Sequence, residues 1–384
     1  MAGTKTGDFK ELLSPFLKGK IASTAQQFGS QSPQVRALTR QYVKDPLEDV
    51  IHASARRRHY ESEVQISFED RPLVGVERLY RRTILIEPTT VCAAHCRWCL
   101  RGQYPVQTMN EDDIVHAARY FGAPGQRDDL DEVLITGGDP FMSLPLLGLT
   151  VHNLRTHAPN IRTIRIGSRV PFHDPRRIND DALALFRKYK DVRFEVGCNV
   201  NHPVEFWPES VAAIHRLQDN GVRIYNQHPL LKGVNDDFQT LVDLYALLRH
   251  HGIDAHYLFH AIPLRGMAHH RTSLVKGLDL ATRISSCGEF SGRAKPRYAV
   301  LSDIGKIVLY DGVIMDRRES DNAILLRSGF RLQDRMKWNP AWQKPDSVVV
   351  EEDGTMLTWY IDGNDEPVEE TAVDSLYHMI AAGQ

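Results

Sequence analysis

Three of the five cysteines lie within eight residues, at Cys92, Cys96 and Cys99, with the spacing C-x3-C-x2-C. Structural zinc usually takes four ligands in paired units; no second pair exists, so His95 would have to be the fourth ligand from beside Cys96. A disulfide would leave one thiol unpaired. A 4Fe–4S cluster normally takes four cysteines, so three thiolates would leave one iron open to an outside ligand. The spacing therefore favours a three-thiolate cluster over zinc or a redox switch.

A second stretch with chemical potential is the turn from Thr136 to Pro140, which contains Gly137, Gly138 and Asp139. Two adjacent glycines let the backbone approach a ligand without a Cβ in the way. Taken alone, this is an ordinary turn sequence. Its place directly after a predicted strand makes it a candidate ligand-binding element.

The elements that must position these residues alternate between strand and helix from about residue 78 onward. Buried strands are predicted at 83–87, 131–135, 163–166, 192–196, 222–225 and 255–259, and helical periodicity fills segments such as 208–220 and 238–251. Repeated strand–helix units imply a parallel sheet with helices outside it. Six such strands predict an α/β fold with a partial (β/α)6 barrel, and such barrels gather chemistry at the carboxyl ends of the strands.

The flanking segments have a different pattern. Residues 1–75 read as an N-terminal helical extension, with helical spacing at 8–18 and 33–43, and residues 76–310 form the predicted core. Residues 311–384 are predicted to be a C-terminal extension whose stretch 347–361 reads as a β-hairpin with a turn at 351–354.

The cysteine motif, with the aromatic Trp98 before Cys99, resembles the radical S-adenosylmethionine (SAM) superfamily. The resemblance implies that SAM chelates the open iron and that the reduced cluster cleaves SAM to a 5′-deoxyadenosyl radical. It also implies that Gly137, Gly138 and Asp139 receive the amino group of SAM.

Further motifs in the same order are similar to the lysine 2,3-aminomutase family, and the resemblance covers about residues 75–310. These motifs are Leu100-Arg101, Leu134 to Pro140, Arg165 to Pro171, Asn201 to Pro203 and Asn226 to Asp236, the last of which contains Gln227. That family uses pyridoxal phosphate (PLP) beside SAM and moves an amino group from the α to the β carbon of an amino acid. We therefore expect a radical SAM, PLP-dependent aminomutase.

The resemblance also implies roles for single residues. Lys306 matches the lysine that forms a Schiff base with PLP, although only Gly305 remains of the glycine run that precedes it in the family. Arg78 and Arg82 match the arginines that hold the PLP phosphate, and could share one face if their segment is helical. Gln227 is expected at the cofactor site. Arg101 matches the arginine that grips the substrate carboxylate by paired hydrogen bonds.

Substrate specificity departs from the lysine enzyme, which uses two aspartates for the distal ammonium of lysine. This sequence has Ile262 at the first position and, without a gap, Leu301 at the second, although a gap would bring Asp303 there. A buried ammonium without a carboxylate is strongly disfavoured. We therefore expect a substrate other than free lysine. The altered loop before Lys306 also motivates an alternative, a PLP-independent radical SAM dehydrogenase, epimerase or deaminase. A degenerate cluster-binding protein without turnover is a third reading.

Composition sets the remaining expectations. The formal net charge of −2 argues against nucleic acid as the main partner, and no run of about 18 apolar residues predicts a membrane span. Without an apolar leader at residues 1–20, we expect a cytoplasmic protein. The expected partners are a small-molecule amino acid and an electron donor such as flavodoxin or ferredoxin. A homo-oligomer is expected, although the family's C-terminal zinc cysteines are missing.

Overall fold

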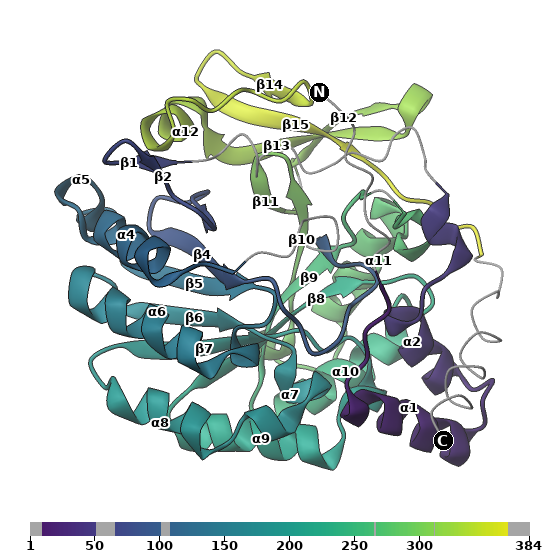
Figure 1. Ribbon diagram of the computed structural model, residues 1–384. Coiled ribbons are helices and arrows are strands. Elements are labelled where there is room, and N and C mark those ends of the chain that lie inside the picture. Colours follow the sequence, from purple (N-terminus) through teal and green to yellow (C-terminus); the bar gives the residue numbers. More distant parts are fainter. Residues whose placement is uncertain (1–9, 51–65, 101–107, 265, 311, 368–384) are drawn as a thin grey trace.

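The computed structural model describes residues 10–50, 66–100, 108–264, 266–310 and 312–367. Its centre is a nine-stranded sheet in the order β11-β10-β9-β8-β7-β6-β5-β4-β3 (Figure 1). The strands from β4 to β10 run parallel, whereas β3 and β11 pair antiparallel with the two outermost of them. The strands of this sheet are β3 (Val76–Glu77), β4 (Thr83–Thr89), β5 (Glu132–Gly137), β6 (Thr163–Gly167), β7 (Arg193–Cys198), β8 (Arg223–Leu230), β9 (Asp254–His260), β10 (Arg297–Ser302) and β11 (Gly305–Val308).

This arrangement confirms the predicted α/β class and the open, curled parallel sheet, and the six predicted strands correspond to β4 through β9. It adds β10 as a seventh parallel strand beyond the six predicted. The sheet ends at β3 on one side and at β11 on the other, so the barrel is partial. The division of the chain at residues 75 and 310 stays a prediction.

Helices cover the outer face of the sheet, where the residues that point outward from the strands form the main apolar core (Figure 1). The helices in and around the barrel are α4 (Glu111–Gly122), α5 (Pro124–Arg127), α6 (Leu144–His157), α7 (Val170–His173), α8 (Asp180–Lys188), α9 (Pro208–Asp219), α10 (Phe238–His250) and α11 (Leu274–Ser286). The side chain of Asn110 accepts a hydrogen bond from the backbone N–H of Asp113 at 2.9 Å, which fixes the start of α4.

Two N-terminal helices, α1 (Pro15–Phe28) and α2 (Pro33–Tyr42), lie at the carboxyl ends of the strands (Figure 1). The first begins later than the predicted segment 8–18, because Ser14 caps it by accepting from the N–H of Leu17 at 3.1 Å. The second agrees with its prediction. The structure therefore brings the N-terminal extension beside the cysteine loop.

The C-terminal part forms a second sheet in the order β12-β13-β15-β14, above the open edge of the barrel (Figure 1). Its elements are β12 (Ile314–Arg318), β13 (Ala323–Arg331), α12 (Leu332–Trp338), β14 (Val348–Val350) and β15 (Thr355–Ile361). The antiparallel pairing of β14 with β15 confirms the predicted hairpin. A small ribbon of β1 (Ser67–Phe68) and β2 (Arg71–Pro72) precedes the barrel.

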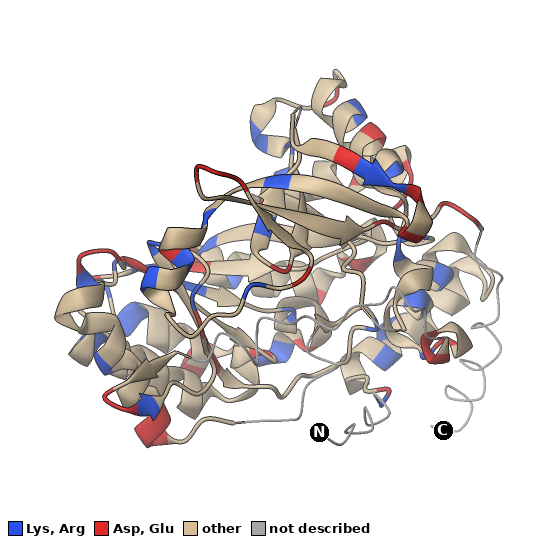
Figure 2. Ribbon diagram, turned by 90° about the horizontal axis from the view of Figure 1, so that it is seen from above, with Lys and Arg blue, Asp and Glu red and all other residues tan. Residues whose placement is uncertain are grey.

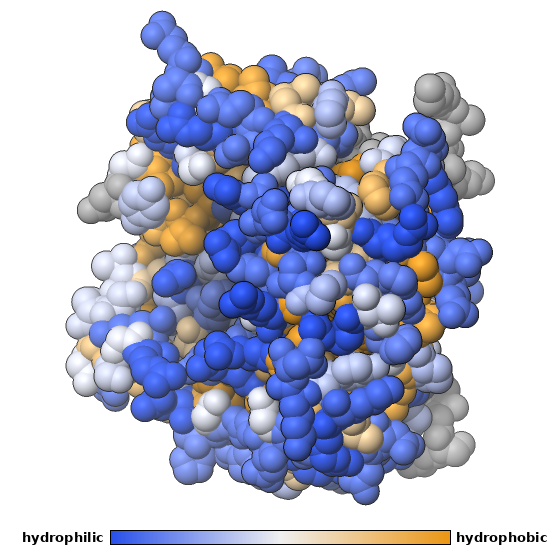
Figure 3. Space-filling view, turned by 90° about the vertical axis from the view of Figure 1, so that its left-hand side faces the viewer, coloured by the Kyte–Doolittle hydropathy of each residue, from blue (hydrophilic) through white to orange (hydrophobic). Residues whose placement is uncertain are grey.

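Two surface features complete the description. Seen from above, basic and acidic residues are intermixed along the ribbon (Figure 2). The face at the amino ends of the strands is largely hydrophilic, with apolar residues gathered in a hollow in its upper part (Figure 3). Within the described residues, every helix is too short or too polar to cross a membrane.

Candidate active site at the barrel mouth

The cysteine loop follows β4 and is held by backbone hydrogen bonds on two sides. The N–H of Gly138 donates to the carbonyl of Thr89 at 2.7 Å, and the N–H of Asp139 donates to that of Val91 at 2.8 Å. On the other side, the N–H of Arg97 donates to the carbonyl of Gln41 in α2 at 3.0 Å. The loop is therefore fixed between the β5 turn and the N-terminal helices.

Cys92, Cys96 and Cys99 are half-buried free thiols in this loop. The pKa of Cys92 is raised, first by burial and then by the neighbouring charge of Cys99. In the described part of the chain, no three His, Cys, Asp or Glu side chains converge tightly enough to hold a metal ion. A four-iron cluster does not require that convergence, because each thiolate binds a different iron. His95 donates through Nδ1 to the carbonyl of Lys10, 2.7 Å away. The donor set thus fits a cluster with three protein thiolates.

The glycine turn lies directly against the cysteine loop. A Cβ added to Gly138 would stand 2.3 Å from the carbonyl oxygen of Val91, and one added to Gly137, whose φ is +111°, would stand 2.4 Å from that of Thr89. Only glycine allows this approach. The neighbouring Asp139 is buried, and its carboxylate accepts from Ser168 Oγ at 2.9 Å and from the N–H of Arg169 at 2.8 Å. The side chain of Asp139 therefore ties the β5 and β6 loops together.

Arg169 follows β6 and belongs to the motif Arg165 to Pro171, but no role was predicted for it. Its Nη1 donates to Sγ of Cys96 at 3.0 Å, and its Nη2 donates to Glu205 at 2.7 Å. The guanidinium carbon lies 5.1 Å from the centre of the Trp98 ring. The predicted cofactor residue Trp98 thus packs on an arginine that contacts a cluster cysteine.

Lys306 lies on the antiparallel edge strand β11, directly opposite Leu301 in β10. Its Nζ stands 4.1 Å from the centre of the Tyr257 ring and 5.1 Å from that of Phe259. Burial first, and then the positive charge of Arg165, lower the pKa of Lys306 to about 7. An amine that is about half neutral near pH 7 is suited to attack an aldehyde, as a PLP lysine must. The amine therefore fits the chemistry that PLP requires.

Polar side chains inside the barrel lie around this amine, namely Arg165, Glu132 and Tyr225. No function was predicted for them from the sequence. Arg165 donates to Glu132 at 2.8 Å and, through Nη2, to the hydroxyl of Tyr225 at 2.7 Å. This cluster could have been predicted from the sequence, because its charged residues occupy alternate positions within otherwise apolar strands. Gln227, half-buried on β8, pairs in register with Tyr257 and so lies on the strand beside the ring that Lys306 covers.

Arg78 and Arg82 have protein partners other than Lys306. Their segment is not helical, so the two side chains do not share a face. Arg78 is buried, donates to the carbonyl of Arg81 at 2.9 Å and lies 5.2 Å from the centre of the Trp338 ring. Arg82 points outward and pairs with Asp131. Their role as phosphate ligands stays a prediction, and Arg101 lies outside the described residues.

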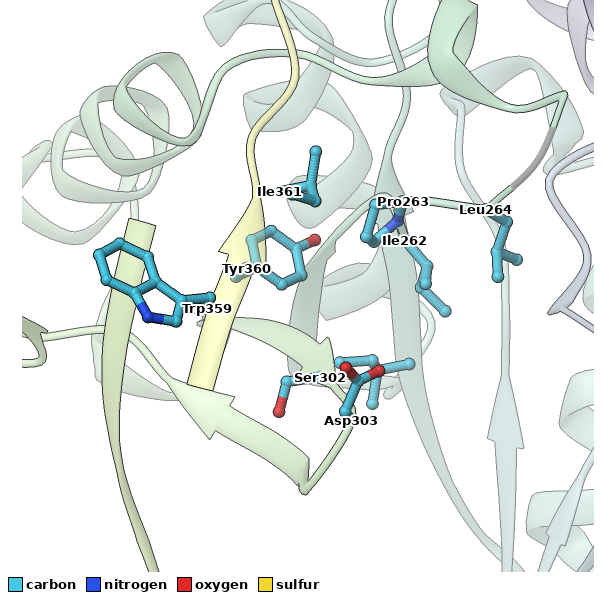
Figure 4. A pocket seen from close by; sticks show the side chains of 9 residues that line it. Ile262, Pro263, Leu264, Ser302, Asp303, Trp359, Tyr360 and Ile361 are labelled. Atoms are coloured by element: carbon cyan, nitrogen blue, oxygen red, sulfur yellow. The ribbon is translucent and has the colours of Figure 1, made fainter. Parts of the chain in front are cut away.

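A small pocket of about 30 Å³ opens between the ends of β9 and β10 and strand β15 (Figure 4). Its wall is mainly apolar, and its polar groups have partners: Ser302 donates to the carbonyl of Gly305 at 2.7 Å, and Asp303 accepts from Ser347. The lining residues are Ile262, Pro263, Leu264, Leu301, Ser302, Asp303, Trp359, Tyr360 and Ile361. Leu301 lines this pocket and stands opposite Lys306 in the β10–β11 ladder, whereas Lys306 itself is not among the lining residues.

Comparisons with known proteins agree with this arrangement. Residues 86–245 match the Radical SAM superfamily. A putative L-lysine 2,3-aminomutase of Aquifex aeolicus is 32% identical over 259 residues, which are 65% of this chain and 67% of that protein. The L-lysine 2,3-aminomutase of Methanococcus maripaludis is 32% identical over 265 residues, 67% of this chain and 59% of its own length. Glutamate 2,3-aminomutase of Clostridioides difficile is 28% identical over 230 residues, 60% of this chain and 53% of its own. The chain thus spans little more than half the length of the last two relatives.

Proposed function

Since this chain belongs to the lysine 2,3-aminomutase family of radical SAM enzymes, we propose that it is a PLP-dependent amino acid 2,3-aminomutase whose substrate is not free lysine. The observation that carries the PLP assignment is the amine of Lys306. It lies over an aromatic ring on the inner side of the barrel, and its lowered pKa of about 7 leaves much of it neutral at physiological pH.

In this proposal, Cys92, Cys96 and Cys99 hold the cluster, and the backbone at Gly137 and Gly138 contacts SAM. When bound, the cluster and SAM would supply a 5′-deoxyadenosyl radical, and PLP on Lys306 would hold the amino group that migrates. The protein contributes placement: the fixed loops must keep the reacting C–H bond beside the radical source and exclude water. The close packing of the cysteine loop on the glycine turn supports such placement.

The proposed substrate carries a short and mainly apolar side chain. The pocket that contains Leu301, the ladder partner of Lys306, is small, and Ile262 and Leu301 occupy its wall where an ammonium would require carboxylates. Relatives with similar identity are named for lysine and for glutamate, so the family itself accepts different side chains. Asp303 is the one carboxylate in the lining, and it accepts a hydrogen bond from Ser347.

A second candidate is a PLP-independent radical SAM enzyme acting on an amino acid or a related small molecule. The observation that favours it is that Arg78 and Arg82 have protein partners of their own, the carbonyl of Arg81 and the carboxylate of Asp131. A cofactor phosphate would then need other cations.

The deciding experiment uses anaerobically purified and reconstituted protein with added PLP. We expect a PLP absorbance band, a pyridoxyl mark on Lys306 after borohydride reduction and peptide mapping, and no mark in the matched variant Lys306→Arg. An iron–sulfur spectrum with SAM cleavage but no Lys306 adduct would select the PLP-independent reading.

Substrate choice is tested on the same preparation with a panel of amino acids. We expect β-amino acid products from short apolar side chains and none from lysine. Turnover of L-lysine to β-lysine that disappears in Asp303→Asn would contradict the substrate proposal and would make Asp303 the partner of the ammonium.

A further inference from the structure

A buried network joins the cysteine loop to the N-terminal helix α2, and Arg169 lies at its centre. The guanidinium contacts three groups from three parts of the chain: Sγ of Cys96 at 3.0 Å, Oε2 of Glu205 at 2.7 Å and Oε1 of Gln41 at 3.2 Å. Arg169 is 8% exposed, and Glu205 and Gln41 are fully buried. These contacts are therefore shielded from solvent, and charge interactions are stronger in such a buried environment than in water.

The guanidinium is also fixed in orientation. Its carbon lies 5.1 Å from the centre of the Trp98 ring and 5.3 Å from that of Tyr42. Its backbone N–H is held by Asp139 at 2.8 Å. Two rings and the β5 turn thus keep Nη1 directed at the cysteine sulfur.

Glu205 is in turn held by several donors. It accepts from the N–H of Asn201 at 2.9 Å, the hydroxyl of Tyr42 at 3.2 Å and Nε2 of Gln41 at 3.3 Å. Its negative charge therefore stays next to Arg169. A buried ion pair of this kind sets a definite local field, whatever it contributes to stability.

We infer that Arg169 raises the reduction potential of the cluster and that Glu205 partly opposes it. This inference rests on the cluster of the proposed function. Hydrogen bonds to ligand sulfurs and nearby charges are among the factors that set the potential of iron–sulfur clusters. An added electron makes the cluster more negative. The positive donor 3.0 Å from a thiolate stabilises the reduced state, and the carboxylate beside that donor destabilises it.

The inference gives the N-terminal extension a function. Gln41 and Tyr42, at the end of α2, contact both members of the Arg169–Glu205 pair. The helix thus takes part in setting the electron affinity of a cluster whose ligands lie in another part of the chain.

The experiment is an anaerobic redox titration of the reconstituted full chain, followed by electron paramagnetic resonance, without SAM, PLP or substrate. In Arg169→Gln we expect the ratio of reduced to oxidised cluster at a fixed potential to fall about tenfold, which is ~59 mV for one electron. In Glu205→Gln we expect that ratio to rise. The matched control is Arg335→Gln, a buried arginine of α12 that donates to the carbonyl of Ile304 and should leave the potential unchanged.

Opposite shifts of the reduction potential in the two variants would show an effect of charge, since a merely structural role would shift the potential of both variants in the same direction. Removing one member of the pair can unfold the chain, so Arg169→Gln/Glu205→Gln serves as a neutral double variant, with an expected potential between those of the two single variants. An unchanged potential in Arg169→Gln, or a fall in Glu205→Gln, would overturn the inference.

Two further outcomes separate this inference from other readings. The Nε of Arg169 has no partner among the described residues and could donate to a bound ligand. A shift seen only after SAM is added would assign Arg169 to SAM and overturn the inference. If the wild-type chain assembles no cluster at all, the proposed function itself fails.

Discussion

The cysteine loop and the lysine strand lie near opposite edges of one nine-stranded sheet, after β4 and on β11. At the first edge, the residues predicted from motifs lie close together: Gly138 touches the loop, and Arg169 donates to Cys96. At the second edge, Lys306 has its aromatic surroundings, but Arg78 and Arg82 pair with other protein groups. The loops that follow neighbouring parallel strands all lie at the carboxyl ends of those strands, so the sheet itself brings their motifs together. Arg78 and Arg82 precede β4 and therefore lie at the amino end of that strand.

The strongest test of the cysteine edge is Gly138→Ala. Its Cβ would stand 2.3 Å from the carbonyl oxygen of Val91 and 2.4 Å from the carbonyl carbon of Thr90, so the loop before Cys92 must move. We expect a loss of about 1–3 kcal/mol in the free energy of unfolding and poor retention of iron. Denaturant unfolding and iron analysis measure both effects.

The matched control for that change is Gly148→Ala in the middle of α6, where an added Cβ meets nothing within 4 Å. Alanine there should stabilise the helix by about 0.5–1 kcal/mol. If Gly138→Ala behaved like Gly148→Ala, the close contact between turn and loop would be wrong.

The buried environment of Lys306 is tested by the pH dependence of its labelling with PLP. Its pKa of about 7 predicts that the initial rate of borohydride trapping with PLP falls about tenfold for each pH unit below 7 and is flat above about pH 8. Exposed lysines, whose ordinary pKa is about 10.4, should still become more reactive as the pH rises above about 8. A Lys306 profile that keeps rising to pH 10 would contradict the buried environment.

The same pKa has a consequence for stability. Between about pH 7 and 10.4 the unfolded lysine holds a proton that the folded one has lost, so the contribution of Lys306 to stability increases with pH across this window. Below pH 7 both states are protonated, and the full cost of burying the charge is present. The difference in unfolding free energy between wild type and Lys306→Met, measured across pH, checks this sign.

The smallest expected effect separates the two charges that act on Lys306. Arg165 lowers the pKa of this lysine and Glu132 raises it. Arg165→Gln should therefore move the midpoint of the trapping profile upward, toward the ordinary lysine value, and Glu132→Gln should move it downward. Shifts in the same direction would mean that the variants act by loosening the barrel, since the two side chains form an ion pair at 2.8 Å.

Most of the fold could be read from the sequence because buried strands and capped helices leave local patterns. The predicted strand 163–166 corresponds to β6, and Asn110 caps α4 by accepting from the N–H of Asp113. The parallel pairing of β10 with β9 depends on contacts across the barrel edge. The sheet built from β12, β13 and β15 likewise depends on pairing between distant segments.

The candidate site was predictable to a different degree at its two edges. The cysteine spacing and the glycine turn are contiguous motifs, so the sequence could place them. Arg78 and Arg82 were matched to the phosphate-binding arginines of the family and would share one face only in a helix, and the segment between β3 and β4 is not helical. The partners of Arg169 could not be foreseen, because Gln41 and Glu205 become neighbours only through the fold.

The network around Arg169 also bears on how the chain acquires its site. Gln41 and its partner Glu205 are separated by 164 residues, and Arg169 is 128 residues from Gln41. During synthesis, the helix that ends at Tyr42 emerges first, yet its partner Glu205 follows only after β7 has been made. Contacts between such distant segments form late, because the intervening chain must be ordered before they close. The charge pair beside the cysteine loop therefore assembles late, after residues 92–99 and the strands up to β7 have been made.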